Sequence, residues 1–379
     1  MAKFNSIGVL TSGGDSPGMN AAVRAVTRAA LQQGVKVYGI YEGYKGLMDD
    51  LPADPKTHFP GSLIDLDACS VTNIVNRGST FLKSARATGF KEEEGMQKAI
   101  ATCRRHNIDG IVAIGGDGTF RGATDLTNRG IPCIGIPGTI DNDITATDES
   151  IGYDTAMNTC VSLIDKLRDT CESHARCNVV EVMGRNAGYV ALETGIAVGA
   201  SGIMVCECPD SMDEEKIFAN INNAKAQGKR SFIVVIAEGV KFQKEAEGIK
   251  NYCEDFTARL EKATGVESKF CRPAHILRGG DPTLRDRLLA ARMGYEAVRL
   301  LLEGKSKLVV CLQKSDIVSI DINYALTLDK MYKKKLKDGD LKAFSEEQVK
   351  EMEAFCEAKA KDFEEMYKES MILGAYPKI

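Results

Sequence analysis

Three glycine-rich turns, each directly after a short apolar run, contain the residues best suited to chemistry. They are the segments 12–18, 115–119 and 137–143. Glycines let backbone N–H groups approach an anion, and the amino end of a following helix attracts negative charge. One such turn, as at Gly13 and Gly14, is also a common way to reverse the chain. Three in succession favour a phosphate site, although none has the P-loop or the dinucleotide-binding pattern.

The carboxylates in these turns are suited to metal binding and proton transfer. Asp117 stands between two glycines, where it is placed to hold Mg²⁺ on nucleotide phosphates or to cap the following helix. Asp141 and Asp143 are two residues apart, so they share one side of an extended segment. A carboxylate that accepts the proton of an attacking hydroxyl would be part of a kinase site. The same turn is equally typical of a calcium site or of a solvated loop.

Basic residues gather in two stretches close to later apolar runs. They are Arg176, Arg185, Lys269, Arg272, His275 and Arg278. The guanidinium fork of arginine matches phosphate oxygens, and histidine adds a hydrogen bond without a fixed charge. Individually such residues most often form surface ion pairs. Their grouping, next to Gly279 and Gly280, favours a second anion site.

Apolar runs of strand length alternate with segments of helical periodicity along most of the chain. The predicted strands are 7–11, 35–40, 110–114, 133–136, 178–182, 203–206, 232–237 and 270–275. The predicted helices are 19–33, 153–168, 188–198, 213–226, 252–263 and 286–302. Strands that are apolar throughout are typical of parallel sheets covered by helices on both faces. The pattern predicts an α/β fold of two doubly wound, mostly parallel, Rossmann-like domains with an active-site cleft between them.

The segment 326–379 departs from this alternation and predicts a C-terminal helical extension. Ser345 and Gln348 have the spacing of a capping box, and a loose apolar stripe follows among charged residues. We expect an amphipathic helix packed on the body of the protein or on a partner. The remaining domains are expected at 1–151 with 276–325, and at 152–275.

Length and composition exclude several classes of protein. With 379 residues, 44% hydrophobic and 27% charged, the chain is neither disordered nor fibrous. A net charge of −4 gives no general attraction to nucleic acid or to an acidic membrane. The apolar runs are far shorter than the roughly 20 residues that span a bilayer, and the N-terminus lacks a leader pattern. Scattered cysteines without disulfide or zinc spacing are typical of buried thiols, so we expect a cytoplasmic protein. From the charge and the short apolar runs we expect no nucleic-acid or membrane partner.

In combination and in this order, the motifs resemble those of the 6-phosphofructokinase family. The matching blocks are 10–20, 115–119, 137–143, 180–185 and 275–280, within a resemblance over roughly residues 5–315. The block 115–119 also occurs in NAD kinases and lipid kinases, but the other blocks do not accompany it there. The resemblance implies a glycolytic enzyme that uses Mg²⁺ to transfer the γ-phosphate of ATP to the 1-hydroxyl of fructose 6-phosphate.

The resemblance also implies roles for individual residues. Asp141 would be the base, Thr139 and Asp143 would shape its loop, and Arg185 would reach the transferred phosphate. The first domain would bind the nucleotide, with Asp117 as the Mg²⁺ ligand and further contacts from Gly14, Arg86, Gly116, Gly118 and Thr119. Lys269 stands where the family has arginine, which keeps the charge but loses the fork. Fructose 6-phosphate would contact Thr139, Ile140, Asp141, Arg176, Met183, Gly184, Arg185, Glu238, Lys269, His275 and Arg278.

Similar enzymes complete the sugar site with arginines of a neighbouring subunit. The resemblance therefore implies a homo-oligomer, a dimer or a tetramer, with shared sugar-phosphate sites. The positions that match the effector site of allosteric relatives hold Arg24, Arg28, Arg168 and Lys229. Gln227 and Ser201 replace a lysine and a glutamate there, so we expect weakened or altered allostery.

Two glycines bear on the choice of phosphoryl donor. In pyrophosphate-using relatives an aspartate stands at the position of Gly118 and a lysine at that of Gly138, where they fill the room of a nucleotide α-phosphate. Glycines at both positions favour ATP. A pyrophosphate-dependent phosphotransferase is one alternative. Another, from a different class, is a non-catalytic paralogue that senses sugar phosphate or nucleotide for a partner subunit.

Overall fold

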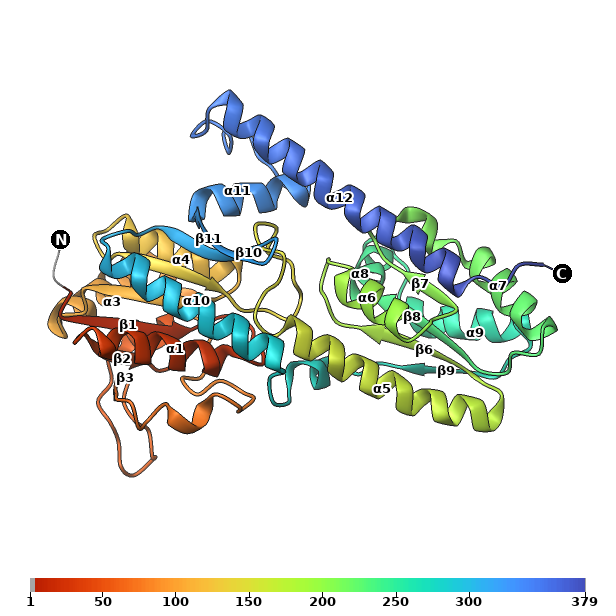
Figure 1. The fold of residues 1–379 in the computed structure, drawn as a ribbon, viewed down its shortest axis with the longest axis horizontal. Helices are drawn as coiled ribbons and strands as arrows, with labels where there is room; N and C mark the ends of the chain where they lie inside the picture. The colour runs from red at the N-terminus through yellow and green to blue at the C-terminus, as the bar shows by residue number, and fades with distance from the viewer. Residues whose placement is uncertain (1–3, 379) are drawn as a thin grey trace. The chain divides into compact units, whose positions relative to one another are not determined.

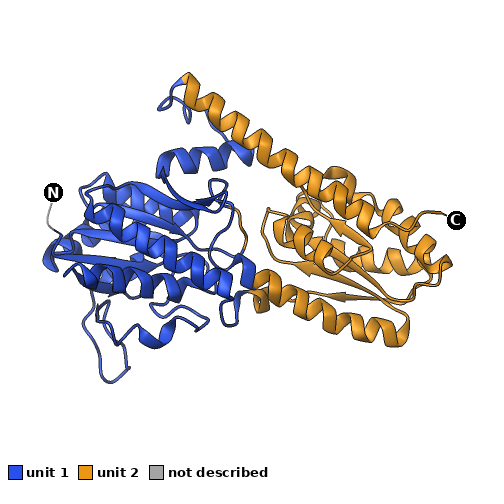
Figure 2. Cartoon of the chain, in the orientation of Figure 1, with its two compact units in different colours: residues 1–140, 144–155, 278–345 blue, residues 141–143, 156–277, 346–379 orange. Residues whose placement is uncertain are grey.

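The predicted alternation of strands and helices is present in two separate parts of the chain (Figures 1 and 2). The computed structural model describes residues 4–378. Unit 1 comprises Met1–Ile140, Ile144–Thr155 and Arg278–Ser345, and unit 2 comprises Asp141–Asp143, Ala156–Leu277 and Glu346–Ile379. These units differ from the predicted domains at the C-terminus, because 326–345 belongs with unit 1 and 346–379 with unit 2. The fold class is α/β in both units, as the sequence predicts.

A sheet of seven strands, in the order β11-β10-β5-β4-β1-β2-β3, forms the centre of unit 1. Its strands are β1 (Ser6–Thr11), β2 (Lys36–Ile40), β3 (Leu63–Leu66), β4 (Gly110–Gly115), β5 (Cys133–Pro137), β10 (Leu308–Gln313) and β11 (Asp316–Asp321). The five central strands run parallel, and β3 and β11 pair antiparallel at the two edges. The strands β1, β4 and β5 are buried along their whole length, which explains their uniformly apolar sequence.

The helices of unit 1 cover both faces of this sheet. They are α1 (Met19–Gln32), α2 (Tyr44–Asp49), α3 (Glu93–Arg105), α4 (Asp117–Thr127), α10 (Leu284–Leu302) and α11 (Ile322–Tyr332). The connections β1-α1-β2 and β4-α4-β5 run in opposite directions across the sheet, so α1 and α4 lie on opposite faces. The strand order reverses between β1 and β4, and ligands of such folds bind where the order reverses.

A parallel sheet of four strands, in the order β7-β8-β6-β9, forms the centre of unit 2. Its strands are β6 (Cys177–Val182), β7 (Gly202–Met204), β8 (Phe232–Ala237) and β9 (Ser268–Cys271). The surrounding helices are α5 (Tyr153–His174), α6 (Tyr189–Ala197), α7 (Glu214–Ala226), α8 (Glu238–Ala246), α9 (Tyr252–Thr264) and α12 (Glu346–Gly374). The first three residues of α5 belong to unit 1.

The predicted strand over 270–275 is wrong in its second half. The strand β9 ends at Cys271, and Ala274–Arg278 form the short 3₁₀ helix η4. Pro273 explains the break, because proline has no N–H to donate to a neighbouring strand. His275 therefore lies on a helical turn instead of a strand end.

The C-terminal helix α12 packs on the body of unit 2. Phe363 is buried and meets Tyr189 of α6 edge to face, with ring centroids 5.0 Å apart. Beyond the helix, the Asn220 side chain donates to the Gly374 carbonyl at 2.9 Å and accepts from the Tyr376 N–H at 2.7 Å. Within residues 4–378, no helix has both the length and the apolar character needed to cross a membrane.

Most cysteines are buried thiols. Eight of the twelve are buried, three are half-buried, and Cys69 is exposed. Burial raises the pKa of the Cys103 and Cys133 thiols to about 12. These side chains therefore pack as small uncharged groups in the core.

Asp286, in the first turn of α10, ties this helix to the start of α5. Its buried carboxylate accepts hydrogen bonds from the Gly152 N–H at 2.7 Å and from the N–H and hydroxyl of Thr155 at 2.8 and 2.5 Å. Desolvation nevertheless raises the pKa of the Asp286 carboxyl from 3.8 to about 6. Deprotonation of Asp286 is thus harder in the folded protein than in the unfolded chain.

We expect Asp286 to make stability depend on pH in a defined direction. Because its folded pKa is raised, its contribution is fully present below the unfolded pKa of 3.8 and is lost as the pH rises through about 6. The loss is on the order of 3 kcal/mol, from about 1.4 kcal/mol per pKa unit. Urea unfolding of the wild type and Asp286→Asn between about pH 4 and pH 7 measures it. The stability advantage of the wild type should fall with pH, and a constant difference contradicts the assignment.

Candidate active site

The first two glycine-rich turns and residues 137–140 of the third lie against one another in unit 1. The Thr119 hydroxyl donates to the Ser12 carbonyl at 3.2 Å, and the Gly138 N–H donates to the Gly115 carbonyl at 3.0 Å. A Cβ on Gly115 would come within 2.3 Å of the Ser12 carbonyl oxygen, so this close approach requires glycine. The turns after β1, β4 and β5 therefore form one continuous backbone surface.

The amino end of α4 is open on this surface. Gly116 caps the helix and Asp117 is its first residue. A Cβ placed on Gly116 or Gly118 would meet no atom within 4 Å. The first N–H groups of a helix have no partner within the helix, and together with the helix dipole they attract anions. This end of α4 is therefore suited to phosphate oxygens.

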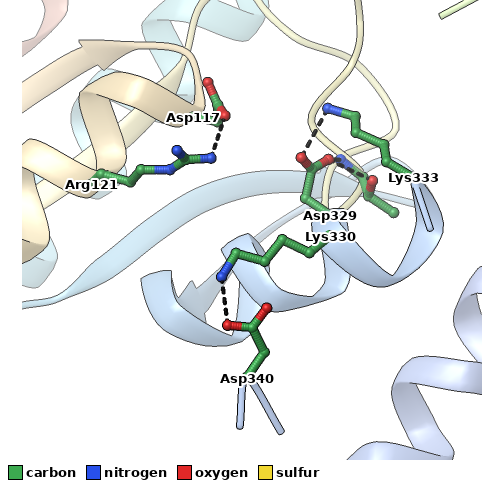
Figure 3. Close-up of polar contacts among 7 residues, drawn as sticks. Asp117, Arg121, Asp329, Lys330, Lys333 and Asp340 are labelled. Atoms are coloured by element: carbon green, nitrogen blue, oxygen red, sulfur yellow. Dashed lines mark hydrogen bonds and ion pairs between the residues drawn. The ribbon is translucent and has the colours of Figure 1, made fainter. Parts of the chain in front are cut away.

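Asp117 forms an ion pair with Arg121, one turn further along α4 (Figure 3). The Asp117 Oδ2 and Arg121 Nη2 atoms are 2.9 Å apart, and both side chains are exposed. Residues 4–378 contain no cluster of three or more acidic, histidine or cysteine side chains that would hold a metal by themselves. A single accessible carboxylate nevertheless fits Mg²⁺, which usually takes its other ligands from water and phosphate. Sequence reasoning missed Arg121, although its i,i+4 spacing from Asp117 indicates the pair.

Two basic residues from other parts of the chain lie near the first turn. Arg278 donates to the Asp15 carbonyl at 3.2 Å, and its side chain is nearly buried. A Cβ on Gly14 would lie 2.6 Å from the Arg278 Nη1 atom, so glycine here makes room for the guanidinium. Arg86 is exposed and lies two residues beyond Ser84, whose hydroxyl donates to the Gly13 carbonyl at 2.6 Å.

Asp141, Arg185 and Glu238 come together in unit 2 from the ends of three strands. Asp141 is 2% exposed, and its Oδ2 atom lies 3.3 Å from the Arg185 Nε atom. The Arg185 N–H donates to the Glu238 carboxylate at 3.0 Å. A buried carboxylate beside an exposed guanidinium is suited to accept a proton and to balance the charge of a phosphate.

The backbone around Arg185 is tightly constrained. Gly184 has φ 152° and Arg185 has φ 52°, a left-handed conformation that is uncommon for a residue with a side chain. A Cβ on Gly239 would lie 2.8 Å from the Arg185 carbonyl oxygen. The turn is thus held between its own glycine and the first turn of α8.

Arg176 and Lys269 lie at the opposite end of the same sheet. The Arg176 Nε and Lys269 Nζ atoms lie 2.7 and 2.9 Å from the Glu267 carboxylate oxygens. The hydrogen bond from Arg176, and next that from Lys269, lowers the pKa of the Glu267 carboxyl to about 2. Arg176 directly precedes β6, whereas Arg185 follows it. A strand of six residues spans roughly 20 Å. The structure therefore does not bring Arg176 and Lys269 to Asp141 of the same chain.

The remaining predicted sugar-site residues differ in the exposure of their side chains. His275 is exposed on η4, Met183 is half-buried, and the Ile140 side chain is fully buried in the core. Arg272 is held by the buried Glu181, with hydrogen bonds of 2.7 and 2.8 Å, and by Glu254. Ile140 can therefore offer a ligand only its backbone.

The expected open space exists beside Gly118 but not beside Gly138. A Cβ on Gly138 would lie 3.0 Å from the Met19 Cε atom and 3.3 Å from the Ile114 Cγ2 atom. A side chain at Gly138 would therefore have to displace Met19 of α1, whereas one at Gly118 would meet open space. The steric argument about the donor rests on Gly118 alone.

Two positions of the expected effector site, the substituted Gln227 and the matching Lys229, contact the C-terminal tail. The Gln227 side chain donates to the Pro377 carbonyl at 2.7 Å. The Lys229 Nζ atom lies 3.3 Å from the Ser201 hydroxyl and 4.8 Å from the centre of the Tyr376 ring. The tail thus covers side chains that the resemblance assigns to effector binding.

Comparison with known proteins covers both units. The family described as Phosphofructokinase matches residues 6–301. The chain is 46% identical over 331 residues to an ATP-dependent 6-phosphofructokinase of Clostridioides difficile, which covers 87% of this chain and 97% of that protein. Identity to an ATP-dependent 6-phosphofructokinase of Bacillus licheniformis is 48% over 316 residues, covering 83% of this chain and 92% of that protein. The solved phosphofructokinase of Saccharomyces cerevisiae is similar at a TM-score of 0.79 and 28% identity, over 97% of this chain and 50% of that chain.

Proposed function

The chain belongs to the phosphofructokinase family, and we propose that it transfers the γ-phosphate of ATP to the 1-hydroxyl of fructose 6-phosphate. The products are ADP and fructose 1,6-bisphosphate, which makes it an enzyme of glycolysis. The proposal rests on one observation above all, the buried Asp141 carboxylate 3.3 Å from the Arg185 guanidinium.

In the proposed reaction Asp141 acts as the general base. It accepts the proton of the sugar hydroxyl as that oxygen attacks the γ-phosphorus, and the bond to the ADP oxygen breaks. Arg185 stabilises the negative charge on the group in transfer. Glu238 holds the Arg185 N–H at 3.0 Å and so keeps the arginine turn in place.

Unit 1 is proposed to bind the nucleotide. The open amino end of α4, with Gly116, Gly118 and Thr119, and the turn at Gly14 would receive its phosphates, and Arg86 would lie near the transferred group. Asp117 would hold Mg²⁺, which when bound neutralises phosphate charge. Support comes from the accessible Asp117 carboxylate and from the open space beside Gly116 and Gly118.

Replacing Arg121 with methionine should lower the Mg²⁺ concentration needed for half-maximal activity. In the wild type the ion competes with the Arg121 guanidinium for the Asp117 carboxylate. Exposed ion pairs contribute about 0.2–1 kcal/mol, so we expect a shift of roughly 1.4- to 5-fold. A titration of activity with Mg²⁺ at fixed ATP measures it, with the exposed Arg230→Ala as control. A shift to higher Mg²⁺ contradicts the competition.

A homo-oligomer, a dimer or a tetramer, is part of the proposal. Arg176 and Lys269 lie roughly 20 Å along the sheet from Arg185, so they suit the sugar phosphate of a second copy. His275 and Arg278 would complete the contacts to the 6-phosphate. A cytoplasmic location is also proposed, supported by cysteines that stand as free thiols.

A donor assay tests the function. Purified protein receives fructose 6-phosphate and Mg²⁺ with equal concentrations of ATP or pyrophosphate. We expect turnover with ATP to exceed turnover with pyrophosphate strongly. A preference for pyrophosphate would refute the ATP assignment. Nucleotide binding in a calorimeter without any ADP release would instead identify a non-catalytic sensor.

A further inference from the structure

Helix α11 lies beyond residues 6–301, the part of the chain that the family model matches, and it contacts the interior of unit 1. The match ends at residue 301, and α11 covers Ile322–Tyr332. This helix packs on α4, whose first residue is Asp117. Figure 3 shows the charged residues Asp329 and Lys330 on α11 and Lys333 directly after its last residue. Of these, Asp329 is buried, with 7% of the residue exposed.

Asp329 binds the segment that follows the Asp141 turn. Its Oδ1 atom accepts hydrogen bonds from the N–H and the hydroxyl of Thr145, at 3.3 and 2.8 Å. Its Oδ2 atom pairs with the Lys333 Nζ atom at 2.8 Å. Thr145 is 2% exposed, so the contact is shielded from water. A buried carboxylate held by three donors fixes the backbone to which it binds, because breaking such a network is costly.

Thr145 stands two residues after Asp143 and four after Asp141. The next residues are attached to the end of β10, since the Asp148 N–H donates to the Leu312 carbonyl at 2.8 Å. On the other side of the turn, the Ser150 hydroxyl donates to the Thr139 carbonyl at 2.6 Å. Between these anchors Asn142 has φ 49°, a conformation that needs support from its surroundings. The contact from Asp329 is the anchor that directly follows the turn.

We propose that Asp329 is a positioning residue that fixes the Asp141 turn through Thr145, an inference that rests on the proposed role of Asp141 as base. Misplacement of a reacting group by about 1 Å costs roughly 10²-fold in rate. Loss of the Asp329 carboxylate removes the acceptor of both Thr145 hydrogen bonds. The backbone that follows the Asp141 turn is then no longer held at Thr145. The residues that bind the substrates are themselves unchanged.

The test compares Asp329→Ala with Asp329→Asn and with Lys330→Ala in the full-length protein. Asp329→Ala should lower kcat by about 10- to 100-fold, with KM for both substrates changed less than about twofold. Asn keeps an acceptor oxygen for Thr145, so Asp329→Asn should recover most of the rate. Lys330→Ala breaks only the 2.8 Å pair with Asp340 and should behave as the wild type. Unchanged kcat in Asp329→Ala, or an equal loss in Lys330→Ala, overturns the inference.

The same measurements in an Asp141→Asn background separate the two proposals. If Asp329 acts through the base, Asp329→Ala should cost little further rate there, and an undiminished loss overturns the positioning role alone. Near-normal turnover of Asp141→Asn overturns the base assignment and this inference with it. If Asp329→Ala does not fold, Thr145→Val replaces it, because it keeps the side-chain volume and removes the 2.8 Å hydrogen bond. Unchanged kcat in that variant overturns the inference.

Discussion

Replacing Asp141 with asparagine is expected to lower kcat by about 10²- to 10⁴-fold, the usual contribution of a general base. An amide has nearly the same shape as the carboxylate but cannot accept the hydroxyl proton. Arg185 is 58% exposed, so water can solvate its charge in the variant and the fold should persist. Steady-state release of ADP measures the loss, and thermal unfolding checks the fold.

Asp143→Asn is the matched comparison for this experiment. Asp143 belongs to the same turn and is half-buried, but it lies two residues further along the chain. The Asp143→Asn variant should lose less rate than Asp141→Asn, because Asp143 shapes the turn and does not accept the proton. An Asp141→Asn enzyme that turns over normally would end the proposed mechanism.

Replacing Arg185 with alanine should lower kcat/KM by about 10²- to 10³-fold, as removal of a charge-stabilising group usually does. Lysine at this position should restore only part of the rate, because an ammonium lacks the planar fork that matches phosphate oxygens. The decrease should appear in kcat whether ATP or fructose 6-phosphate is the substrate that is varied. Arg230→Ala, an exposed arginine of the same unit, is the control and should behave as the wild type. Full activity of Arg185→Ala would contradict its role in charge stabilisation.

Local patterns were sufficient to predict the strands and turns near the site. The uniformly apolar runs became buried strands, and Gly115 and Gly116 lie where β4 passes into α4, as the glycine spacing indicates. The family resemblance implied roles for Asp141 and Arg185 in one reaction, but it did not predict the 3.3 Å ion pair between them. Periodicity alone does not show which strand ends meet, because strand order is a property of the whole sheet.

The end of β9 follows from a local signal, because Pro273 disfavours a strand. Other parts that the sequence did not predict depend on contacts between distant residues. The packing of Met19 against Gly138 and the bond from Asp329 to Thr145 join residues more than a hundred positions apart. No spacing rule predicts such pairs. The separation of Arg176 from Arg185 likewise follows from their attachment to opposite ends of one strand.

The cysteine thiols differ in exposure, which allows selective labelling of this protein. Cys69 is the exposed cysteine among the twelve, and it stands in a tight turn where the Asp67 carboxylate accepts its N–H at 2.9 Å. The buried thiols combine poor access with a raised pKa, so they supply little of the thiolate that alkylating reagents attack. Brief treatment with a maleimide dye at neutral pH should therefore label Cys69 of unit 1 ahead of the eight buried thiols of the wild-type chain.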